Sequence, residues 1–370
     1  MRLPALMFGT LALLAGCAAG GPSMSSTTEP TPSPTSRVDA LMQDYAGQGP
    51  GASVLVVRDG EAIVRGSYGL ADLEAKTPVT PQTNYRLASV SKQFTAAAIL
   101  LLAQDGKLSI DDPVRRWLPS LPPADDAITI RHLLTHTSGL IDYEDLMDPA
   151  DTSQIHDSGV LELLSKETKH YFEPGTSYRY SNSGYALLSL IVERASGQRY
   201  ADFVHARIFQ PLGMHDTVAY ENGISTVAHR AFGYTFEDGG WQRTDQSTTS
   251  AVLGDGGIYS SITDLQKWDA ALYDERLLPR AVWMQAWTPA TKTDEADVEY
   301  GFGWRITGET LWHSGETVGF RNVIVRWPQR HLTVVVLTNR NEPEPYAMAK
   351  KIGALFLDDS ANGNVVSHAR

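Results

Sequence analysis

The sequence has a single cysteine in 370 residues, so no disulfide bond can form within the chain. It has no cluster of Lys and Arg, and its formal net charge is -12 at pH 7, which argues against nucleic acid or an anionic membrane surface as a partner. No Gly-x-Ser-x-Gly motif occurs, which excludes the strand-turn-helix elbow of the α/β-hydrolases. With 42% hydrophobic and 20% charged residues, the composition is that of a globular protein of one large or two modest domains.

The first 17 residues, MRLPALMFGTLALLAGC, combine one positive charge, a short apolar run and then small residues. The apolar run is too short for a stable membrane anchor, so the pattern predicts a bacterial export signal. Its end, LAGC, resembles a bacterial lipoprotein box, which implies a signal peptide at 1–16 and acylation of the Cys17 thiol after cleavage. The alternative is an ordinary secretory signal in which the cysteine is incidental.

Residues 17–36 continue with Ser, Thr, Pro and Gly and have hardly an apolar side chain. Such a segment cannot bury enough surface to fold, so we expect a flexible tether. With Ala18 after the cysteine, nothing obvious retains the protein in the inner membrane. The predicted location is therefore the bacterial cell envelope, lipid-anchored at the outer membrane and facing the periplasm.

The rest of the chain has strand patterns at both ends and helical patterns between them. Residues 52–69 form two β-rich runs that meet at Asp59-Gly60, a dipeptide preferred in tight hairpins. Residues from about 107 to 290 show mostly helical spacing, and β-branched and aromatic runs return before a final helix. This order predicts an α/β (α+β) fold at 37–358, with a tail at 359–370. An antiparallel sheet built from both terminal segments is flanked by helices, and a mostly helical region is inserted.

A helix that is apolar all round begins with a serine and a lysine in RLASVSKQFTAAAILLLAQDGK. Ser89 and Lys92 are three residues apart, so both side chains lie on one helix face, where a base can reach a hydroxyl proton. A lysine in an apolar site is neutral more readily, and unpaired N–H groups at a helix start can stabilise an oxyanion. The alternative is a capping serine with a lysine that extends to solvent. Ser-x-x-Lys occurs only here in the chain.

Four longer stretches carry a family resemblance: NYRLASVSKQFTAAAILLLAQDGK, EPGTSYRYSNSGYALLSLIVERASG, GDGGIYSSITDLQKW and WHSGETVGF. Together with HLLTHTSGL, they resemble the serine β-lactamase-like family in its class C branch. That branch includes β-lactamases, penicillin-binding carboxypeptidases, D-aminopeptidases and carboxylesterases. The resemblance covers residues 38–354, and it implies the β-lactamase/transpeptidase fold.

The resemblance makes Ser89 the acylated nucleophile, Lys92 its neighbouring base and Tyr180 the tyrosine of a Tyr-x-Asn motif. A tyrosine beside a cationic lysine has its phenolate favoured, and it could shuttle a proton between nucleophile and leaving group. Asn182, the last residue of the motif, would orient the substrate through its amide. A second match at Tyr220-Glu221-Asn222 lies in a turn without the family context, so we favour Tyr180.

The third motif of the family, Lys-Thr-Gly on a strand, is replaced here by His313-Ser314-Gly315. A histidine at this position exchanges a fixed positive charge for a group that titrates near neutral pH, which weakens the case for substrates that carry a carboxylate. Gly315 belongs to the predicted substrate-binding strand, and Glu316 would supply a second oxyanion N–H. Lys351-Ile352-Gly353 lies on the final helix and is no substitute.

His132 and His136 are four residues apart and could in principle bind zinc, but no carboxylate-plus-histidine motif follows and the family uses no metal. No cofactor is therefore expected. Gly256-Gly257 either matches a glycine pair of the family that borders the cleft or forms a turn before the next helix.

These features favour a metal-free serine hydrolase that forms an acyl-enzyme on an ester or amide, of the esterase or D-amino-acid peptidase type. A β-lactamase or penicillin-binding carboxypeptidase is the alternative, and the substrate stays open among small esters, peptides and β-lactams. A non-catalytic envelope-binding lipoprotein is a further alternative. The expected active site lies in the crevice between the sheet and the inserted region.

Overall fold

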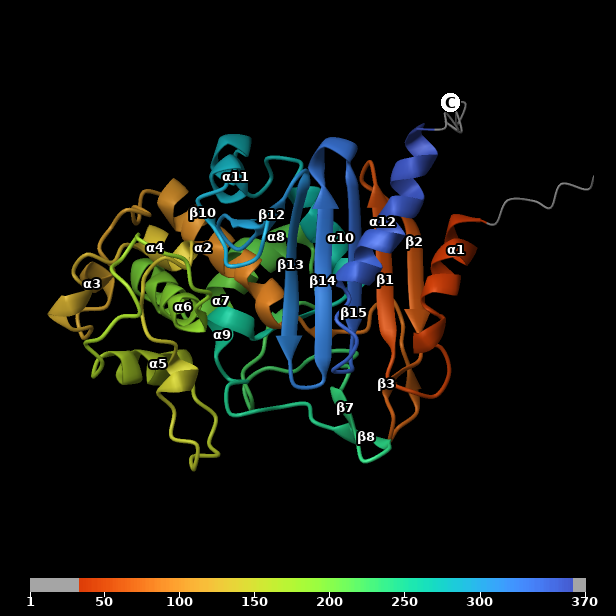
Figure 1. The fold of residues 1–370 in the computed structure, drawn as a ribbon, viewed down its shortest axis with the longest axis horizontal. Helices are drawn as coiled ribbons and strands as arrows, with labels where there is room; N and C mark the ends of the chain where they lie inside the picture. The colour runs from red at the N-terminus through yellow and green to blue at the C-terminus, as the bar shows by residue number, and fades with distance from the viewer. Residues whose placement is uncertain (1–32, 362–370) are drawn as a thin grey trace, which may run out of the picture. The chain divides into compact units, whose positions relative to one another are not determined.

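The computed structural model describes residues 33–361 (Figure 1). The predicted signal peptide, the acylated Cys17 and most of the tether lie outside the described residues. Within residues 33–361, no helix has the length and apolar character needed to cross a bilayer. Helix α1 (Pro34–Leu41) starts three residues before the predicted Arg37, so it includes the last three residues assigned to the tether, and Ser33 caps it by accepting from the Ser36 amide.

The main sheet joins the two ends of the described chain, as predicted. Strand β1 (Ala52–Arg58) pairs antiparallel with both β2 (Glu61–Tyr68) and β15 (Leu332–Thr338). Asp59 and Gly60, which connect β1 to β2, have φ values of 51° and 83°, so the turn has the left-handed backbone that this dipeptide tolerates. The sheet has the order β10-β11-β12-β13-β14-β15-β1-β2. Its other strands are β10 (Thr291–Lys292), β11 (Glu299–Tyr300), β12 (Arg305–Thr307), β13 (Thr310–Thr317) and β14 (Phe320–Trp327).

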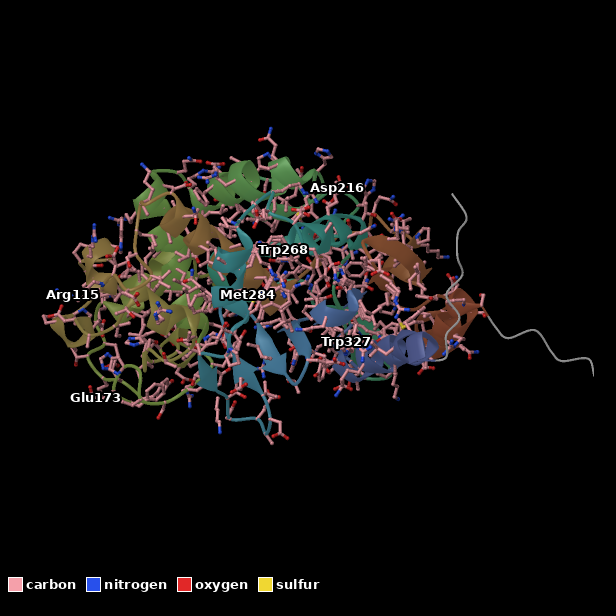
Figure 2. The ribbon with its side chains drawn as sticks, turned by 90° about the horizontal axis from the view of Figure 1, so that it is seen from above. Arg115, Glu173, Asp216, Trp268, Met284 and Trp327 are labelled. Carbon is pink, nitrogen blue, oxygen red and sulfur yellow. The ribbon has the colours of Figure 1, made fainter. Side chains whose placement is uncertain are left out.

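Both faces of this sheet are covered, which is why its central strands are apolar at consecutive positions. Val54 and Val56 pack with helices α1 and α12 (Tyr346–Ala361), whereas Leu55 and Val57 face the opposite core, which includes α10 (Ile262–Ala271). Seen from above, Trp268 of α10 and Trp327 of β14 lie on opposite sides of the strands (Figure 2). Helix α12 reaches Ala361, so it continues beyond the predicted domain end at residue 358.

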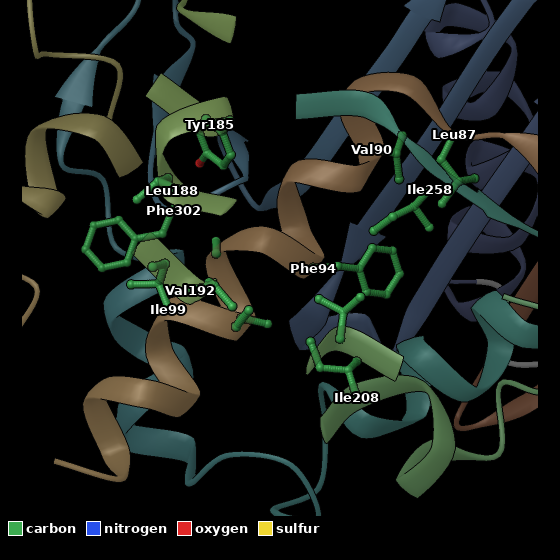
Figure 3. Close-up of a cluster of buried hydrophobic side chains, with 14 of the residues drawn as sticks. Leu87, Val90, Phe94, Ile99, Tyr185, Leu188, Val192, Ile208, Ile258 and Phe302 are labelled. Atoms are coloured by element: carbon green, nitrogen blue, oxygen red, sulfur yellow. The ribbon is translucent and has the colours of Figure 1, made fainter. Parts of the chain in front are cut away.

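The inserted helical region packs around the predicted apolar helix. Helix α2 (Lys92–Gln104) is buried from Lys92 to Leu102, and its neighbours include α6 (Asn182–Ser196). Phe94 lies close to Ile258 and Ile208 in this core, while Ile99 lies near Val192 of α6 (Figure 3). Helix α6 begins where Ser181 accepts from the Gly184 amide and ends at Gly197, whose φ is 74°.

The remaining elements are short and connect these layers. The other helices are α3 (Val114–Trp117), α4 (Ile130–Leu134), α5 (Asp157–Leu164), α7 (Tyr200–Val204), α8 (Gln210–Leu212), α9 (Leu253–Gly256) and α11 (Arg280–Trp287). The small sheets are formed by β3 (Leu70–Asp72) with β4 (Thr77–Pro78), by β5 (Tyr85–Arg86), β9 (Ile258–Ser260) and β6 (Val218–Ala219), and by β7 (Tyr234–Glu237) with β8 (Gly240–Arg243).

A buried ion pair ties α10 to the main sheet. Arg326 Nε of β14 donates to Asp269 Oδ1 at 2.8 Å, and the Thr333 hydroxyl of β15 donates to the same oxygen at 2.7 Å. Both charged side chains are almost fully buried. Removing either charge alone would leave the other without compensation in the core.

We therefore expect Asp269→Ala to lower the free energy of unfolding by about 3–5 kcal/mol, because Arg326 keeps its charge and loses its partner. Urea denaturation followed by circular dichroism measures the change. The double variant Asp269→Leu with Arg326→Met should recover most of the loss. A single variant as stable as the wild type would contradict this account of the ion pair.

Candidate active site

The predicted nucleophile lies in a tight turn between strand β5 and helix α2. Ser89 belongs to a 3-10 turn, Ala88–Ser91, rather than to the α-helix that the sequence predicts. Ala88 has a φ of 50°, a left-handed backbone that is strained for a residue with a Cβ atom. The Leu87 amide donates to Ile258 O at 2.8 Å, and the Asn322 side chain donates to Arg86 O at 2.7 Å. Strands on two sides therefore fix the serine.

Lys92 is fully buried and directs its ammonium group at three acceptors. Its Nζ donates to Ser89 Oγ at 3.0 Å, to Asn182 Oδ1 at 2.9 Å and to Asp255 O at 2.9 Å. The acceptors come from three separate segments, the 3-10 turn, helix α6 and helix α9. The structure thus brings together Ser89, Lys92 and Asn182, as the sequence analysis predicts.

Burial lowers the pKa of Lys92 to about 8, and the nearby carboxylates of Asp255, Asp142 and Glu144 oppose that shift. At pH 7 roughly a tenth of the side chain is then neutral. The ammonium form predominates, but the neutral form that a proton acceptor needs is accessible at ambient pH.

Tyr180 lies beside Lys92, but not in the protonation state that the sequence analysis expects. Lys92 Nζ is 4.9 Å from the centre of the Tyr180 ring, so the lysine lies over the aromatic face. Burial raises the pKa of Tyr180 well above its usual value, and the Ser89 hydroxyl and the Arg305 guanidinium offset only part of the rise. The expectation of a favoured phenolate is therefore wrong for the resting protein, in which Tyr180 is a neutral phenol.

Asn182 connects the lysine to acidic side chains that the sequence analysis did not select. Its Nδ2 donates to Glu144 Oε1 at 3.1 Å, and its backbone amide donates to Asp142 Oδ2 at 2.9 Å. Since Oδ1 accepts from Lys92, the orientation of the amide is fixed from both ends. Asn182 and Glu144 both line the pocket in front of Ser89.

His313 is buried in strand β13 with 1% of its surface exposed. Its Nδ1 lies 2.6 Å from Ser314 O, which can only accept, so Nδ1 carries the proton and Nε2 accepts from the Tyr300 hydroxyl at 2.9 Å. Burial and the positive charge of Arg305 lower the pKa of His313 well below its usual value. The expectation that His313 titrates near neutral pH is therefore wrong: the side chain is neutral, and it does not line the pocket.

Gly315 and Glu316 lie where strand β13 passes the 3-10 turn. A Cβ atom on Gly315 would be 2.0 Å from Leu87 O, so only glycine allows the strand to lie this close to the turn that carries Ser89. Glu316 is exposed at the pocket, with its carboxylate 3.7 Å from Arg321 Nε. The strand therefore borders the serine, as the resemblance implies.

A small pocket opens at Ser89. Its charged lining comprises the carboxylates of Glu144, Asp255 and Glu316 together with Arg86, whose Nη2 donates to Ser250 O at 2.7 Å. The other residues that line it are Ala88, Ser89, Tyr143, Asn182, Thr249, Gly256 and Thr317. Gly256 thus borders the cleft, which was one of the two interpretations of the glycine pair.

Asp255 contacts both Lys92 and Tyr143, and the pKa of its carboxyl is raised. Its backbone oxygen accepts from Lys92, and its Oδ2 accepts from the Tyr143 hydroxyl at 3.1 Å. Burial raises the pKa of the carboxyl to about 7, although the Lys92 charge opposes the rise. The sequence signal was present in GDGG, where an acidic residue stands between glycines, but nothing in the local pattern shows that it meets Lys92.

The competing sequence matches lie elsewhere or have other contacts. The Tyr220 hydroxyl lies 3.4 Å from Asn222 Oδ1 in its own loop, and Lys351 is exposed on α12. His132 Nδ1 accepts from the Thr129 amide at 3.3 Å and helps to cap α4. His136 Nδ1 accepts from the Ser181 amide at 3.1 Å.

Comparisons with known proteins agree with this geometry. Residues 36–357 match the Beta-lactamase family. Penicillin-binding protein 4* of Bacillus subtilis is 34% identical over 316 residues, which cover 80% of this chain and 70% of that protein. A D-aminopeptidase of Gluconobacter oxydans is 29% identical over 321 residues, covering 83% of this chain and 59% of that protein.

The fold also matches solved structures. The crystal structure of a penicillin binding protein from Bacillus halodurans has a TM-score of 0.75 and 30% sequence identity, covering 87% of this chain and 98% of the other. The long antiparallel sheet flanked by helices is thus shared over nearly the whole described region. The chain therefore belongs to the β-lactamase family and is a serine hydrolase of the acyl-enzyme type.

Proposed function

We propose that the chain hydrolyses small amides or esters in which a free amino group lies next to the scissile carbonyl. Ser89 Oγ attacks the carbonyl carbon, the bond to the leaving amine or alcohol breaks, and water then hydrolyses the acyl-enzyme. The amides of Ser89 and Glu316 hold the developing oxyanion. The single observation that carries the substrate class is the pocket at Ser89, which has three carboxylates among its lining residues.

Lys92 and Tyr180 divide the proton transfers between them. The neutral fraction of Lys92 takes the proton of Ser89, since Nζ lies 3.0 Å from Oγ. Tyr180, a neutral phenol beside the lysine, donates its proton to the leaving group and recovers one from the Lys92 ammonium. Asn182 keeps the lysine in place through its own contact at 2.9 Å.

The carboxylates favour a cationic substrate group over an anionic one. Asp255 and Glu144 line the same pocket as Ser89, and Asp255 uses one carboxyl oxygen for Tyr143. An ammonium on the substrate would pair with these groups and hold Asp255 ionised. The one cationic lining residue, Arg86, is 3% exposed and donates to Ser250 O.

The same charges disfavour substrates that must be held by a carboxylate. His313 stands where the family motif Lys-Thr-Gly has its lysine, and here it is neutral and bonded to Tyr300 and Ser314. A β-lactam or a peptide with a free carboxylate next to the leaving group would find no fixed positive charge on this strand. The D-aminopeptidase relative is named for a substrate with a free amino end, which agrees with the proposal.

We also propose that the protein is a lipoprotein of the cell envelope. LAGC supports cleavage before Cys17 and acylation of its thiol, and the polar segment that follows would hold the hydrolase domain away from the lipid. The hydrolase would then act on small molecules in the periplasm. Metabolic labelling with a palmitate analogue, compared with Cys17→Ala, tests this anchor.

We expect a fluorophosphonate to add to wild-type residues 33–361 and not to Ser89→Ala, because only an activated serine reacts. Intact mass measures the adduct. A labelled penicillin in a parallel incubation tests the alternative substrate class. A folded wild-type protein that reacts with neither reagent would refute the hydrolase mechanism at this site.

We expect the p-nitroanilide of D- or L-alanine to be cleaved at least about tenfold faster than the same compound with its amino group acetylated, because acetylation removes the charge that pairs with the carboxylates. Asp255→Asn and Glu144→Gln should each reduce this preference, measured as a ratio of kcat/KM values. Thr249→Val, which changes a lining residue without changing charge, is the control. Equal rates for the free and acetylated compounds would reject the ammonium site.

The labelling rate should rise with pH and level off above about pH 8, because the neutral form of Lys92 is the base and burial lowers its pKa to about 8. Asp255→Asn removes the negative charge that most opposes this shift, so the rise should move to lower pH. Glu316→Gln removes a carboxylate of the same pocket that is not among the charges acting on Lys92, and it serves as the control. A rise that stays in place in Asp255→Asn would contradict the coupling.

A further inference from the structure

His136 is a buried titratable residue to which the mechanism above gives no role. It belongs to HLLTHTSGL, the stretch that resembles the family most closely, and it follows helix α4 directly. Only 1% of its surface is exposed, and its φ of 59° places the backbone in the left-handed region. Non-glycine residues seldom have a positive φ, although histidine is among those that tolerate it, and a buried imidazole is expected to have hydrogen-bond partners.

The contacts of His136 bracket Tyr180. Its backbone oxygen accepts from the Arg179 amide at 3.0 Å, and its Nδ1 accepts from the Ser181 amide at 3.1 Å. The residues immediately before and after Tyr180 are therefore both bound to one residue. The Ser181 amide thus donates to an imidazole nitrogen, whereas in paired strands it would donate to a backbone carbonyl.

The ring of His136 also packs against the ring of Tyr180. The two centroids are 4.4 Å apart with an interplanar angle of 38°, and Tyr185 and Tyr300 lie against the same imidazole at 5.1 and 4.5 Å. Because Nδ1 accepts, the proton of the neutral ring is on Nε2, which is buried and has no hydrogen-bond partner in the described part of the chain. Burial and the Lys92 charge lower the pKa of His136 well below its usual value.

We infer that His136 is a positioning residue that fixes the backbone and ring of Tyr180 against Lys92, so that the phenol is aimed for proton transfer. The inference rests on the proposed function, because it gives Tyr180 a proton to move.

Two variants separate the two contacts. His136→Asn retains a side-chain acceptor and tolerates the left-handed backbone, but it loses the ring. His136→Phe retains a ring against Tyr180 and loses the acceptor for Ser181. For D- or L-alanine p-nitroanilide, whose leaving amine must be protonated, we expect each variant to lower kcat by about 10–100-fold with KM changed by less than about threefold, since misplacing a group by about 1 Å costs up to that much.

The matched control is His132→Asn, which changes a histidine of the same segment whose contact is to the Thr129 amide. It should leave kcat within about twofold of the wild type, because this contact caps α4 and does not reach Tyr180. Circular dichroism and thermal unfolding show which variants are folded. A rise in KM with unchanged kcat in the His136 variants would overturn the inference.

A double-mutant cycle with Tyr180→Phe distinguishes positioning from general support of the fold. If His136 acts through the Tyr180 hydroxyl, His136→Asn should change kcat by less than about twofold once that hydroxyl is gone. The same loss in both backgrounds would overturn the inference while leaving the proposed function intact. A wild type without a Ser89 adduct would instead refute the proposed function.

The wild-type protein provides a test that requires no variant. Nitrogen-15 spectra of the histidine side chains should show His136 with a bare Nδ1 and a protonated Nε2, and this tautomer should persist at pH values below the ordinary histidine pKa, because burial lowers the pKa of His136. A protonated Nδ1 would show that the contact to Ser181 is absent, and it would overturn the inference even if every His136 variant fails to fold.

Discussion

The ammonium group of Lys92 is the constraint on which the site depends. Burying a lysine charge costs several kcal/mol unless acceptors surround it, and here the acceptors are Ser89, Asn182 and Asp255 O. These belong to segments far apart in the sequence, so the lysine is satisfied only when the 3-10 turn, α6 and α9 have all packed. The group that activates the serine is therefore also the one that ties the inserted helices to the turn. Its partial deprotonation follows from the same burial, because a site that solvated the charge fully would hold the proton too tightly to act as a base.

The protonation state of Lys92 depends on its surroundings, which are carboxylates on one side and uncharged rings on the other. The carboxylates of Asp142, Glu144 and Asp255 favour the ammonium form, and burial opposes them. Tyr180 and His313 carry no charge, since burial raises the pKa of the phenol and lowers that of the imidazole. The base thus faces an acidic pocket at the substrate end and neutral rings behind it. When neutral Lys92 takes the serine proton, the ammonium that forms therefore has carboxylates on one side and uncharged rings on the other.

Local sequence patterns correctly predict the features that depend on interactions between residues close together in the chain. The hairpin at Asp59-Gly60 and the pairing of Ser89 with Lys92 depend on neighbouring residues only, and both are confirmed in the structure. Tyr180 and Asn182 lie about ninety residues from Lys92, and only the family resemblance selected them. Asp255 gives no periodic or spacing signal, because its importance comes from a tertiary contact. The protonation states of Tyr180 and His313 were misjudged for the same reason: they depend on burial, which a motif does not specify.

The residues that decide substrate charge are separate from those that build the fold. Glycine at 315 is required because a Cβ atom there would lie 2.0 Å from Leu87 O, and the α2 core is required to bury Lys92. The side chains of Glu144, Glu316 and Asp255 instead face a pocket, where a change of charge leaves the packing of sheet and helices intact. One scaffold can therefore serve different substrates through changes in the pocket lining. In this chain carboxylates line the pocket at Ser89 and strand β13 has no fixed positive charge, so the substrate selection that we propose is electrostatic.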